Sequence, residues 1–419
     1  MRVTSSEEYQ RIYKAQRTFF EEGATRSHKF RKAQLHKLKK LIRENEPAIE
    51  QAIHKDFGKP LMETFATEIG ILYGEINTAL EHLKRWMRPE LVETPWVLWP
   101  ARSTKRAVPK GVTLIIGPWN YPLQLLLAPL VSAIAAGNTA IIKPSEHTSH
   151  TSRLVYEMIH NHFEEGLVAV VEGEGDKLIP SMLEQLHFDH IFFTGSVAVG
   201  RKIAAMAAPH LTPITLELGG KSPAIVDASA NLGVAARRIA FGKWVNAGQT
   251  CVAPDYLLVH RSVESAFLEI LQKVIIEFYG NDPLQNTEGY SGIINQKRFE
   301  VLKAYLDRGT VVCGGRTDAE KLRIEPTIIK NVSLSDPVMQ EEIFGPVLPV
   351  LTFDEVAEAT TIILQNPNPL ALYIFTRDKA VERSFTEPLQ FGGGAVNNTI
   401  VHLGNPYLPF GGIGQSGYG

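Results

Sequence analysis

Cys251 is the residue whose type and setting best suit nucleophilic chemistry. It follows a glycine and small polar residues in NAGQTCVAP, just beyond a segment predicted to be helical, so a ligand can reach its sulfur. A cysteine taken alone is more often an inert, small core residue than a nucleophile. The second cysteine, Cys313, follows a β-branched run in TVVCGG and is interpreted in that inert way.

Glu217 and the segment GPWNYP (117–122) lie where strands are expected to end. Glu217 closes the predicted strand of PITLELGGKSP, and the two glycines after it allow close approach of the backbone. On this local pattern alone, a surface role fits Glu217 as well as a functional one. In GPWNYP, a glycine and two prolines place Trp119 and Asn120 in a rigid turn after the strand VTLII. A side-chain amide at such a strand end can donate to an oxyanion.

Two further segments have features of a cofactor site. Lys143 and Glu146 follow a strand in IIKPSE, where lysine can reach a ribose or phosphate and glutamate can accept from ribose hydroxyls. Gly195 and Gly200 lie in FTGSVAVG, which follows another strand and opens a helix. Their spacing differs from the G-x-G-x-x-G dinucleotide fingerprint, so the pattern is weak. A glycine turn at a helix N-terminus can still accept a pyrophosphate.

Composition excludes several classes of function. The formal charge of −2 gives no global field to recruit nucleic acid or acidic membranes. Two cysteines cannot build a disulfide framework, which favours a reducing compartment, and we expect a cytoplasmic protein. The longest apolar run, 123–137, contains Pro129 and is too short to span a membrane comfortably. No metal site is predicted.

The elements that must position these residues fall into two α/β parts. Residues 6–87 have helical periodicity, and 91–106 alternates like two strands of a projecting arm. From residue 112, apolar strands (VTLII, TAIIK, LVAVVEG and HIFFTG) alternate with helical segments, which predicts a parallel sheet covered on both faces. The alternation restarts after Glu217 with SPAIVD and DYLLVH. With 419 residues, the chain is long enough for two or three domains.

The order of these motifs is more specific than any of them alone. GPWNYP, IIKPSE, FTGS, LELGGKSP, GQTC, EEIFGPV and PFGGIGQSG follow one another along the chain, from about residue 5 to the end. In this the sequence resembles the aldehyde dehydrogenase superfamily, and its short N-terminal region is most similar to the class 3 and fatty-aldehyde branch. The resemblance implies a Rossmann-like cofactor domain, an α/β catalytic domain and a small β oligomerisation arm.

The resemblance also implies a role for each catalytic residue. Cys251 matches the nucleophile and Glu217 the general base, while Asn120 matches the amide that forms an oxyanion hole with the nucleophile's backbone N–H. Addition of the thiolate to an aldehyde gives a tetrahedral alkoxide, which collapses by expelling hydride to C4 of the nicotinamide. Water activated by Glu217 then hydrolyses the thioester to a carboxylic acid.

The same carry-over implies a cofactor site. Lys143 and Glu146 match residues near the adenosine ribose, and the FTGS residues lie at the pyrophosphate. Glu342 of EEIFGP matches a ligand of the nicotinamide ribose, and Phe344 packs near the nicotinamide. NAD is expected to be preferred and NADP tolerated. The residues predicted to bind cofactor are Trp119, Lys143, Glu146, Gly195, Ser196, Gly200, Glu342 and Phe344.

We therefore expect a cofactor domain at 1–90 and 107–217, a catalytic domain at 218–391, and an oligomerisation element from 91–106 with 392–419. The expected assembly is a homodimer, and the expected substrate is an apolar aliphatic or aromatic aldehyde. Two alternatives remain: an acylating enzyme that passes its thioester to coenzyme A or phosphate, and a non-catalytic protein on the same scaffold. Relatives usually continue beyond PFGGIGQSG, some to a membrane anchor, which we do not expect in this chain, so the preferred chain length of the aldehyde is not predicted.

Overall fold

The computed structural model describes residues 2–419, and helices and parallel strands alternate along most of the chain. The α-helices are α1 (Ser6–Glu21), α2 (His28–Glu44), α3 (Glu46–Phe57), α4 (Leu61–Thr64), α5 (Gly70–Trp86), α6 (Gln124–Ala136), α7 (Ser149–His162), α8 (Gly175–Gln185), α9 (Val197–Ala207), α10 (Leu232–Trp244), α11 (Glu264–Tyr279), α12 (Gln296–Tyr305), α13 (Pro337–Gln340), α14 (Val356–Leu364) and α15 (Lys379–Thr386). The strands are β1 (Glu90–Val92), β2 (Ser103–Lys105), β3 (Val112–Ile116), β4 (Thr139–Lys143), β5 (Val168–Val170), β6 (His190–Thr194), β7 (Ile214–Glu217), β8 (Pro223–Val226), β9 (Tyr256–His260), β10 (Thr310–Cys313), β11 (Thr317–Asp318), β12 (Arg323–Ile324), β13 (Thr327–Lys330), β14 (Val347–Phe353), β15 (Ala371–Phe375), β16 (Gly393–Val396) and β17 (Gly417–Tyr418).

The chain divides into two compact units. The first unit comprises Met1–Ile49, Phe65–Phe193 and Ile203–Ile214, and the second comprises Glu50–Thr64, Thr194–Lys202 and Thr215–Gly419. The predicted α/β class is confirmed, since both units carry parallel strands and helices.

The first unit is built on the parallel strands β6-β3-β4-β5, in that order. Every residue of β3 and β4 is buried, as expected for strands covered on both faces. Helix α6 packs on β3 and β4 and is itself covered by α2 and α5, so its apolar sequence is that of a core helix. It ends at Gly137, whose φ of 87° suits glycine and where a Cβ would fall 2.3 Å from the Arg31 guanidinium.

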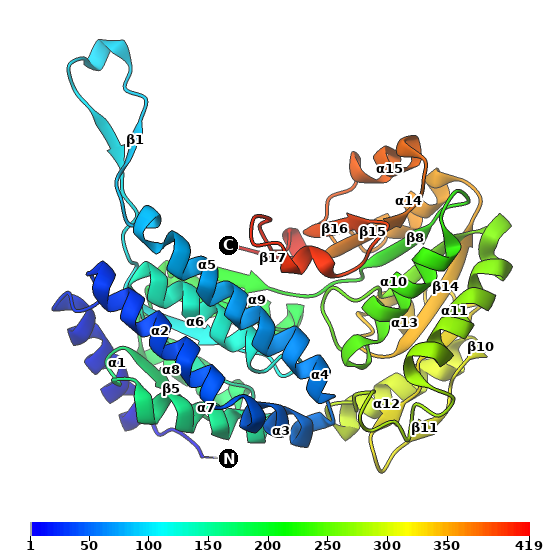
Figure 1. Ribbon diagram of the computed structural model, residues 1–419, viewed down its shortest axis with the longest axis horizontal. Coiled ribbons are helices and arrows are strands. Elements are labelled where there is room, and N and C mark those ends of the chain that lie inside the picture. Colours follow the sequence, from blue (N-terminus) through cyan, green and yellow to red (C-terminus); the bar gives the residue numbers. More distant parts are fainter. Residues whose placement is uncertain (1) are drawn as a thin grey trace. The chain divides into compact units, whose positions relative to one another are not determined.

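The arm predicted at 91–106 is a two-stranded hairpin in the first unit. Strands β1 and β2 pair antiparallel, with Leu91 opposite Thr104. Figure 1 shows this hairpin standing away from the helices of its own unit. Its tip, Trp96–Leu98, is a short 3-10 turn, and the relative exposures of Trp96 and Trp99 are 85% and 79%. The tip therefore presents large apolar side chains to solvent.

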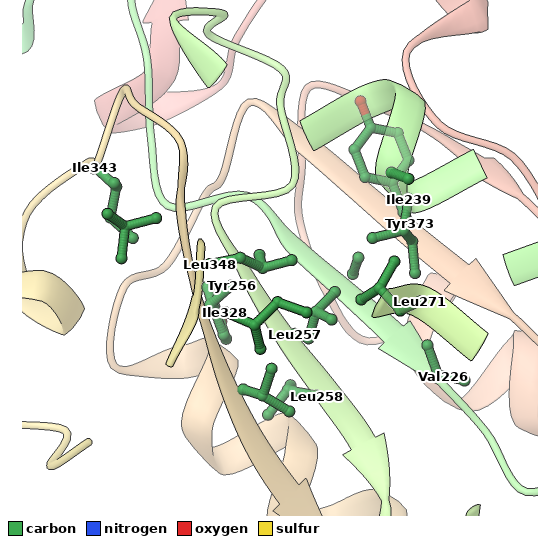
Figure 2. Close-up of a cluster of buried hydrophobic side chains, with 14 of the residues drawn as sticks. Val226, Ile239, Tyr256, Leu257, Leu258, Leu271, Ile328, Ile343, Leu348 and Tyr373 are labelled. Atoms are coloured by element: carbon green, nitrogen blue, oxygen red, sulfur yellow. The ribbon is translucent and has the colours of Figure 1, made fainter. Parts of the chain in front are cut away.

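The second unit contains a seven-stranded sheet in the order β10-β13-β14-β9-β8-β15-β16. Neighbouring strands from β13 to β16 are parallel, while β10 is an antiparallel edge strand. Its core joins strand residues such as Leu257 and Leu348 to Ile239 of α10 and Leu271 of α11 (Figure 2). This buried framework supports the loops at the carboxyl ends of the strands.

The last residues of the chain also enter the second unit. Strand β17 pairs antiparallel with β7, placing Gly417 opposite Glu217. The N–H of Leu218 donates to the carbonyl of Ser416 at 3.1 Å. The motif PFGGIGQSG thus reaches the strand that carries the candidate base. Within residues 2–419, no helix is long and apolar enough to cross a membrane.

Candidate active site

Cys251 follows a turn that only a few residue types tolerate. Helix α10 leads into a short 3-10 segment, Val245–Gly248, in which Asn246 and Ala247 have φ near 54° and 51°. Gly248 follows with φ 76°, and a Cβ there would lie 2.2 Å from the carbonyl oxygen of Gly345. Because side-chain-bearing residues rarely adopt positive φ, this backbone is held by its surroundings and sets the position of the nucleophile.

Gln249, next to this turn, is a supporting residue that sequence reasoning missed. Its buried amide donates to the carbonyls of Asn246 at 3.0 Å and Gly292 at 2.9 Å, and it accepts from the N–H of Ile294 at 3.0 Å. The glutamine of GQTC therefore ties the nucleophile's turn to the loop at 292–294. Its place inside the motif was the only available signal, because its partners are distant in sequence.

Glu217 lies at the end of β7, as predicted. Its carbonyl accepts from the N–H of Gly195 at 3.0 Å, which joins the FTGS turn to the LELGG strand. Its side-chain Oε2 is buried with no hydrogen-bond partner among residues 2–419. Burial without a compensating donor raises the pKa of Glu217 to about 7. A carboxylate with this pKa can take a proton near neutral pH.

The Glu342 side chain lies against the first of the two glycines that follow the LEL strand. A Cβ at Gly219 would fall 2.1 Å from its Oε2, so only glycine permits this close approach. Its Oε1 is buried and has no hydrogen-bond partner in the described part of the chain. Burial, with a further contribution from the charge of Asp255, raises the pKa of Glu342 to about 8.

The two carboxylates act on the nucleophile itself. Burial of the sulfur, followed by the negative charges of Glu342 and Glu217, raises the pKa of Cys251 to about 12. The residues predicted as nucleophile, base and nicotinamide-ribose ligand are therefore electrostatic neighbours within one unit. In this environment the neutral thiol is favoured over the thiolate.

Lys143 and Glu146 form a pair at the end of β4 in the first unit. The ammonium of the buried Lys143 contacts Glu146 Oε2, and Glu146 Oε1 accepts from the N–H of Gly175 at 2.9 Å. Burial alone would raise the pKa of Glu146, but the hydrogen bond and charge of Lys143 outweigh it and lower that pKa. The carboxylate is thus held ionised beside a lysine, a pairing suited to ribose hydroxyls.

The GPWNYP turn belongs to the first unit as well. Asn120 is buried, whereas Trp119 is partly exposed. The turn leads into α6, where the N–H groups of Leu123 and Gln124 donate to Glu68 Oε2 at 2.9 and 3.2 Å. A buried carboxylate at a helix N-terminus satisfies donors that the helix leaves open. Glu68 was missed because it lies far away in sequence, within a helical segment.

The remaining predicted cofactor residues differ in what surrounds them. Ser196 is exposed directly before α9. At Gly200 a Cβ would lie 2.7 Å from Leu218 Cδ2, so packing on the LELGG segment already accounts for this glycine. Phe344 is partly buried and has φ 46°. Within residues 2–419, no three His, Cys, Asp or Glu side chains are grouped to hold a metal ion.

Comparison with known proteins assigns this arrangement to a family. The model of the Aldehyde dehydrogenase family matches residues 1–419. The chain is 46% identical to 4,4'-diaponeurosporen-aldehyde dehydrogenase of Staphylococcus aureus, over 96% of this chain and 88% of that protein. It is 42% identical to the dimeric NADP-preferring aldehyde dehydrogenase of Rattus norvegicus, over 97% and 89%. The substrate-bound structure of Staphylococcus aureus AldH superimposes with a TM-score of 0.96 at 45% identity, covering 98% of this chain and 90% of that one. The chain belongs to the aldehyde dehydrogenase family and is an oxidoreductase that oxidises aldehydes.

Proposed function

We propose that this enzyme oxidises aldehydes to carboxylic acids through a thioester on Cys251, which water hydrolyses with Glu217 as base. The observation that carries the proposal is Glu217, whose buried Oε2 has no hydrogen-bond partner among residues 2–419, whose pKa is about 7 and whose charge acts on Cys251. A hydrolytic base needs a pKa near the working pH, and Glu217 has one because nothing in its surroundings offsets its burial.

Each residue has a defined step in this scheme. Cys251 loses its proton to solvent, and its thiolate forms a bond to the aldehyde carbon while Glu217 stays ionised for the later step. The side-chain amide of Asn120 and the N–H of Cys251 stabilise the resulting oxyanion; one such donor contributes about 3–4 kcal/mol to the transition state. When bound, the nicotinamide ring supplies a hydride acceptor. Glu217 then takes a proton from water, whose oxygen adds to the thioester, and the thiolate leaves as the carboxylic acid forms.

The residues present fit a nicotinamide dinucleotide. Glu342 Oε1 is a buried acceptor with no partner in residues 2–419, and the absence of a side chain at Gly219 lets this carboxylate lie against the backbone. Lys143 and Glu146 offer a donor and an acceptor for the second ribose. Gly195 and Ser196 precede a helix N-terminus suited to a pyrophosphate. Relatives with NAD and with NADP in their names both occur among the matched proteins.

We propose that NAD is preferred and NADP tolerated. Glu146 is held ionised, so the 2′-phosphate of NADP would meet a like charge, which Lys143 offsets only in part. We expect a discrimination of about 1–3 kcal/mol, roughly tenfold to a hundredfold in kcat/KM. Glu146→Gln should narrow this ratio, because it removes the repulsion and keeps an acceptor. This ratio is obtained from steady-state kcat/KM with NAD and with NADP, measured for the wild type and for Glu146→Gln. An unchanged ratio, or a wild type that prefers NADP, would place Glu146 away from the ribose.

The alternative acceptor of the acyl group is coenzyme A or phosphate. Absorbance at 340 nm with a medium-chain aldehyde, with and without coenzyme A or phosphate, separates the two schemes. Hydrolysis predicts full turnover in the absence of either and a free carboxylic acid as product. Turnover that requires coenzyme A or phosphate would instead establish an acylating enzyme. No reduction of NAD or NADP with any of a panel of aliphatic and aromatic aldehydes would exclude the proposed function.

We further propose a homodimer in which 91–106 and 392–419 form the oligomerisation element, beside a cofactor domain at 1–90 and 107–217 and a catalytic domain at 218–391. Two observations support an assembly. The hairpin tip exposes Trp96 and Trp99, and large exposed apolar groups favour an interface. Strand β16 lies at an edge of the seven-stranded sheet, where its outer side can pair with another strand.

Replacing both tip tryptophans should weaken this dimer. Because interface tryptophans often contribute 2 kcal/mol or more, we expect Trp96→Ser with Trp99→Ser to raise the dimer dissociation constant at least about thirtyfold. Sedimentation velocity across a protein dilution series measures this constant, with circular dichroism as the check on folding. A wild type that is monomeric at micromolar concentration, or a variant with an unchanged constant, would contradict the role of the arm.

A further inference from the structure

A buried ion pair lies beneath the loop that carries Glu342, and nothing in the proposed chemistry uses it. Lys221 Nζ and Asp255 Oδ2 are 2.6 Å apart, and the side chains are only 2% and 5% exposed. Lys221 lies two residues beyond Gly219, and Asp255 lies just before β9. Both residues belong to the second unit.

All the donors of this lysine are engaged. Besides Asp255, its ammonium donates to the carbonyls of Val338 at 2.7 Å and Glu341 at 3.0 Å. An ammonium has three N–H donors, so each has one acceptor. Two of these acceptors are backbone carbonyls of the segment 338–343, which runs from α13 into the loop after it, and one of them belongs to the residue directly before Glu342.

Asp255 holds the same loop from the other side. Its Oδ1 accepts from the N–H of Ile343, the residue directly after Glu342, at 3.0 Å. Its own N–H donates to the carbonyl of Ser222 at 2.7 Å, which ties it to the segment that carries Lys221. The fully buried side chain of Ile343 adds an apolar anchor (Figure 2). One ion pair therefore binds the backbone on both sides of Glu342.

The position that results is specific. The Glu342 carboxylate lies against Gly219, and its charge is felt by Cys251. A buried ion pair rarely stabilises a fold more than an apolar pair of the same volume, since both charges lose their hydration. Stability alone therefore does not account for this pair. A role in fixing the geometry of the segment 338–343 does account for it.

We propose that Lys221 and Asp255 are positioning residues that set the carboxylate of Glu342 for the cofactor. The proposal rests on the function proposed above, because it takes Glu342 as a ligand of the nicotinamide ribose. Loss of the ion pair frees the backbone on both sides of Glu342. The carboxylate is then no longer held in a single position. Cofactor affinity and the rate of hydride transfer then fall together, although Glu342 itself is unchanged.

The test uses a double variant, Lys221→Met with Asp255→Val, which we call the clamp variant. The wild type and the clamp variant are each compared with and without Glu342→Gln. We expect the clamp variant to lower kcat/KM for NAD and NADP at least about tenfold, as loss of an outer-shell support does at other sites. We expect Glu342→Gln to lower it in the wild type but to change it less than about twofold in the clamp variant, because the carboxylate is already displaced. Full additivity, or a kcat/KM within twofold of the wild type, would overturn the proposal.

Hydrogen exchange provides a readout that does not depend on activity. The N–H of Ile343 is protected by Asp255, so exchange across 338–345 should accelerate in the clamp variant and stay slow in Glu342→Gln. Unchanged exchange there would overturn the clamp, whatever the activity. A wild type without aldehyde-dependent reduction would remove the proposed function, while exchange would still decide whether the ion pair holds the loop.

Two further variants guard against a purely structural effect. Arg316 and Glu325 form another ion pair of the second unit, at 2.6 Å, and Arg316→Met with Glu325→Leu should lower the melting temperature without changing cofactor kinetics.

If the clamp variant does not fold, Arg298→Ala acts on the same loop. Arg298 donates to the carbonyl of Glu342 at 3.3 Å and to that of Ile343, and it is only partly buried. It should lower cofactor affinity and raise exchange at 338–345; normal values of both would count against positioning of this loop.

Discussion

Cys251→Ser is expected to abolish aldehyde oxidation while leaving the fold and cofactor binding intact. The hydroxyl is a far weaker nucleophile than the thiolate and cannot form the thioester that the scheme requires. We expect turnover to fall at least roughly 10³-fold, which corresponds to about 4 kcal/mol of activation free energy. Reduction of NAD at 340 nm measures turnover, and a melting curve with and without NAD checks the fold and the cofactor site.

Cys313→Ser is the matched control. Cys313 is the last residue of the edge strand β10, where it is partly buried against the core of the second unit and has no step in the proposed scheme. It should retain nearly all activity, and the contrast between the two serine variants separates loss of a nucleophile from a general effect of removing sulfur. Near-normal turnover in Cys251→Ser would exclude the covalent mechanism.

Glu217→Gln should block the second half of the reaction and spare the first. The amide keeps the shape of the side chain but cannot take a proton from water, so hydrolysis should slow about 10²–10⁴-fold. Rapid mixing with aldehyde and NAD should show a burst of reduced cofactor close to one per active site, followed by slow turnover. Mass spectrometry of the quenched protein should detect the acyl group on Cys251.

The raised pKa of Glu217 also predicts the pH dependence of this step. The base works only when ionised, so the hydrolysis rate of the wild type should fall as the pH drops below about 7 and level off above it. This decrease in rate below pH about 7 should be absent from the slow phase of Glu217→Gln. If the burst itself disappears while NAD still binds, Glu217 acts earlier, as the group that takes the proton of Cys251.

Local sequence was enough to predict the elements of the parallel sheets. The strands VTLII and TAIIK were predicted at 112–116 and 139–143, where β3 and β4 occur. Strands buried on both faces are continuously apolar and bounded by polar or glycine turns, so their limits are written in a few neighbouring residues. The order of motifs likewise identified the family, and with it the candidates Cys251 and Glu217.

The contacts that support the site could not be predicted from local sequence. The Glu68 carboxylate that meets the start of α6 and the Gln249 amide that meets 292–294 join segments far apart in the chain. Their sequences contain no periodicity that would relate them to their partners. Such pairings depend on which loops the folded sheet brings together, and a helical glutamate gives no sign of that.

The chemistry of the site depended most on tertiary structure. The sequence by itself determined that the chain is an α/β aldehyde dehydrogenase with a cysteine and a glutamate as candidate nucleophile and base. Only the folded unit decided that burial raises the pKa values of Glu217 and Glu342, and that burial with these two charges raises the pKa of Cys251. It also decided that Lys221 and Asp255 hold the backbone on both sides of Glu342. Desolvation and charge pairing are properties of the three-dimensional neighbourhood, and residue type alone does not contain them.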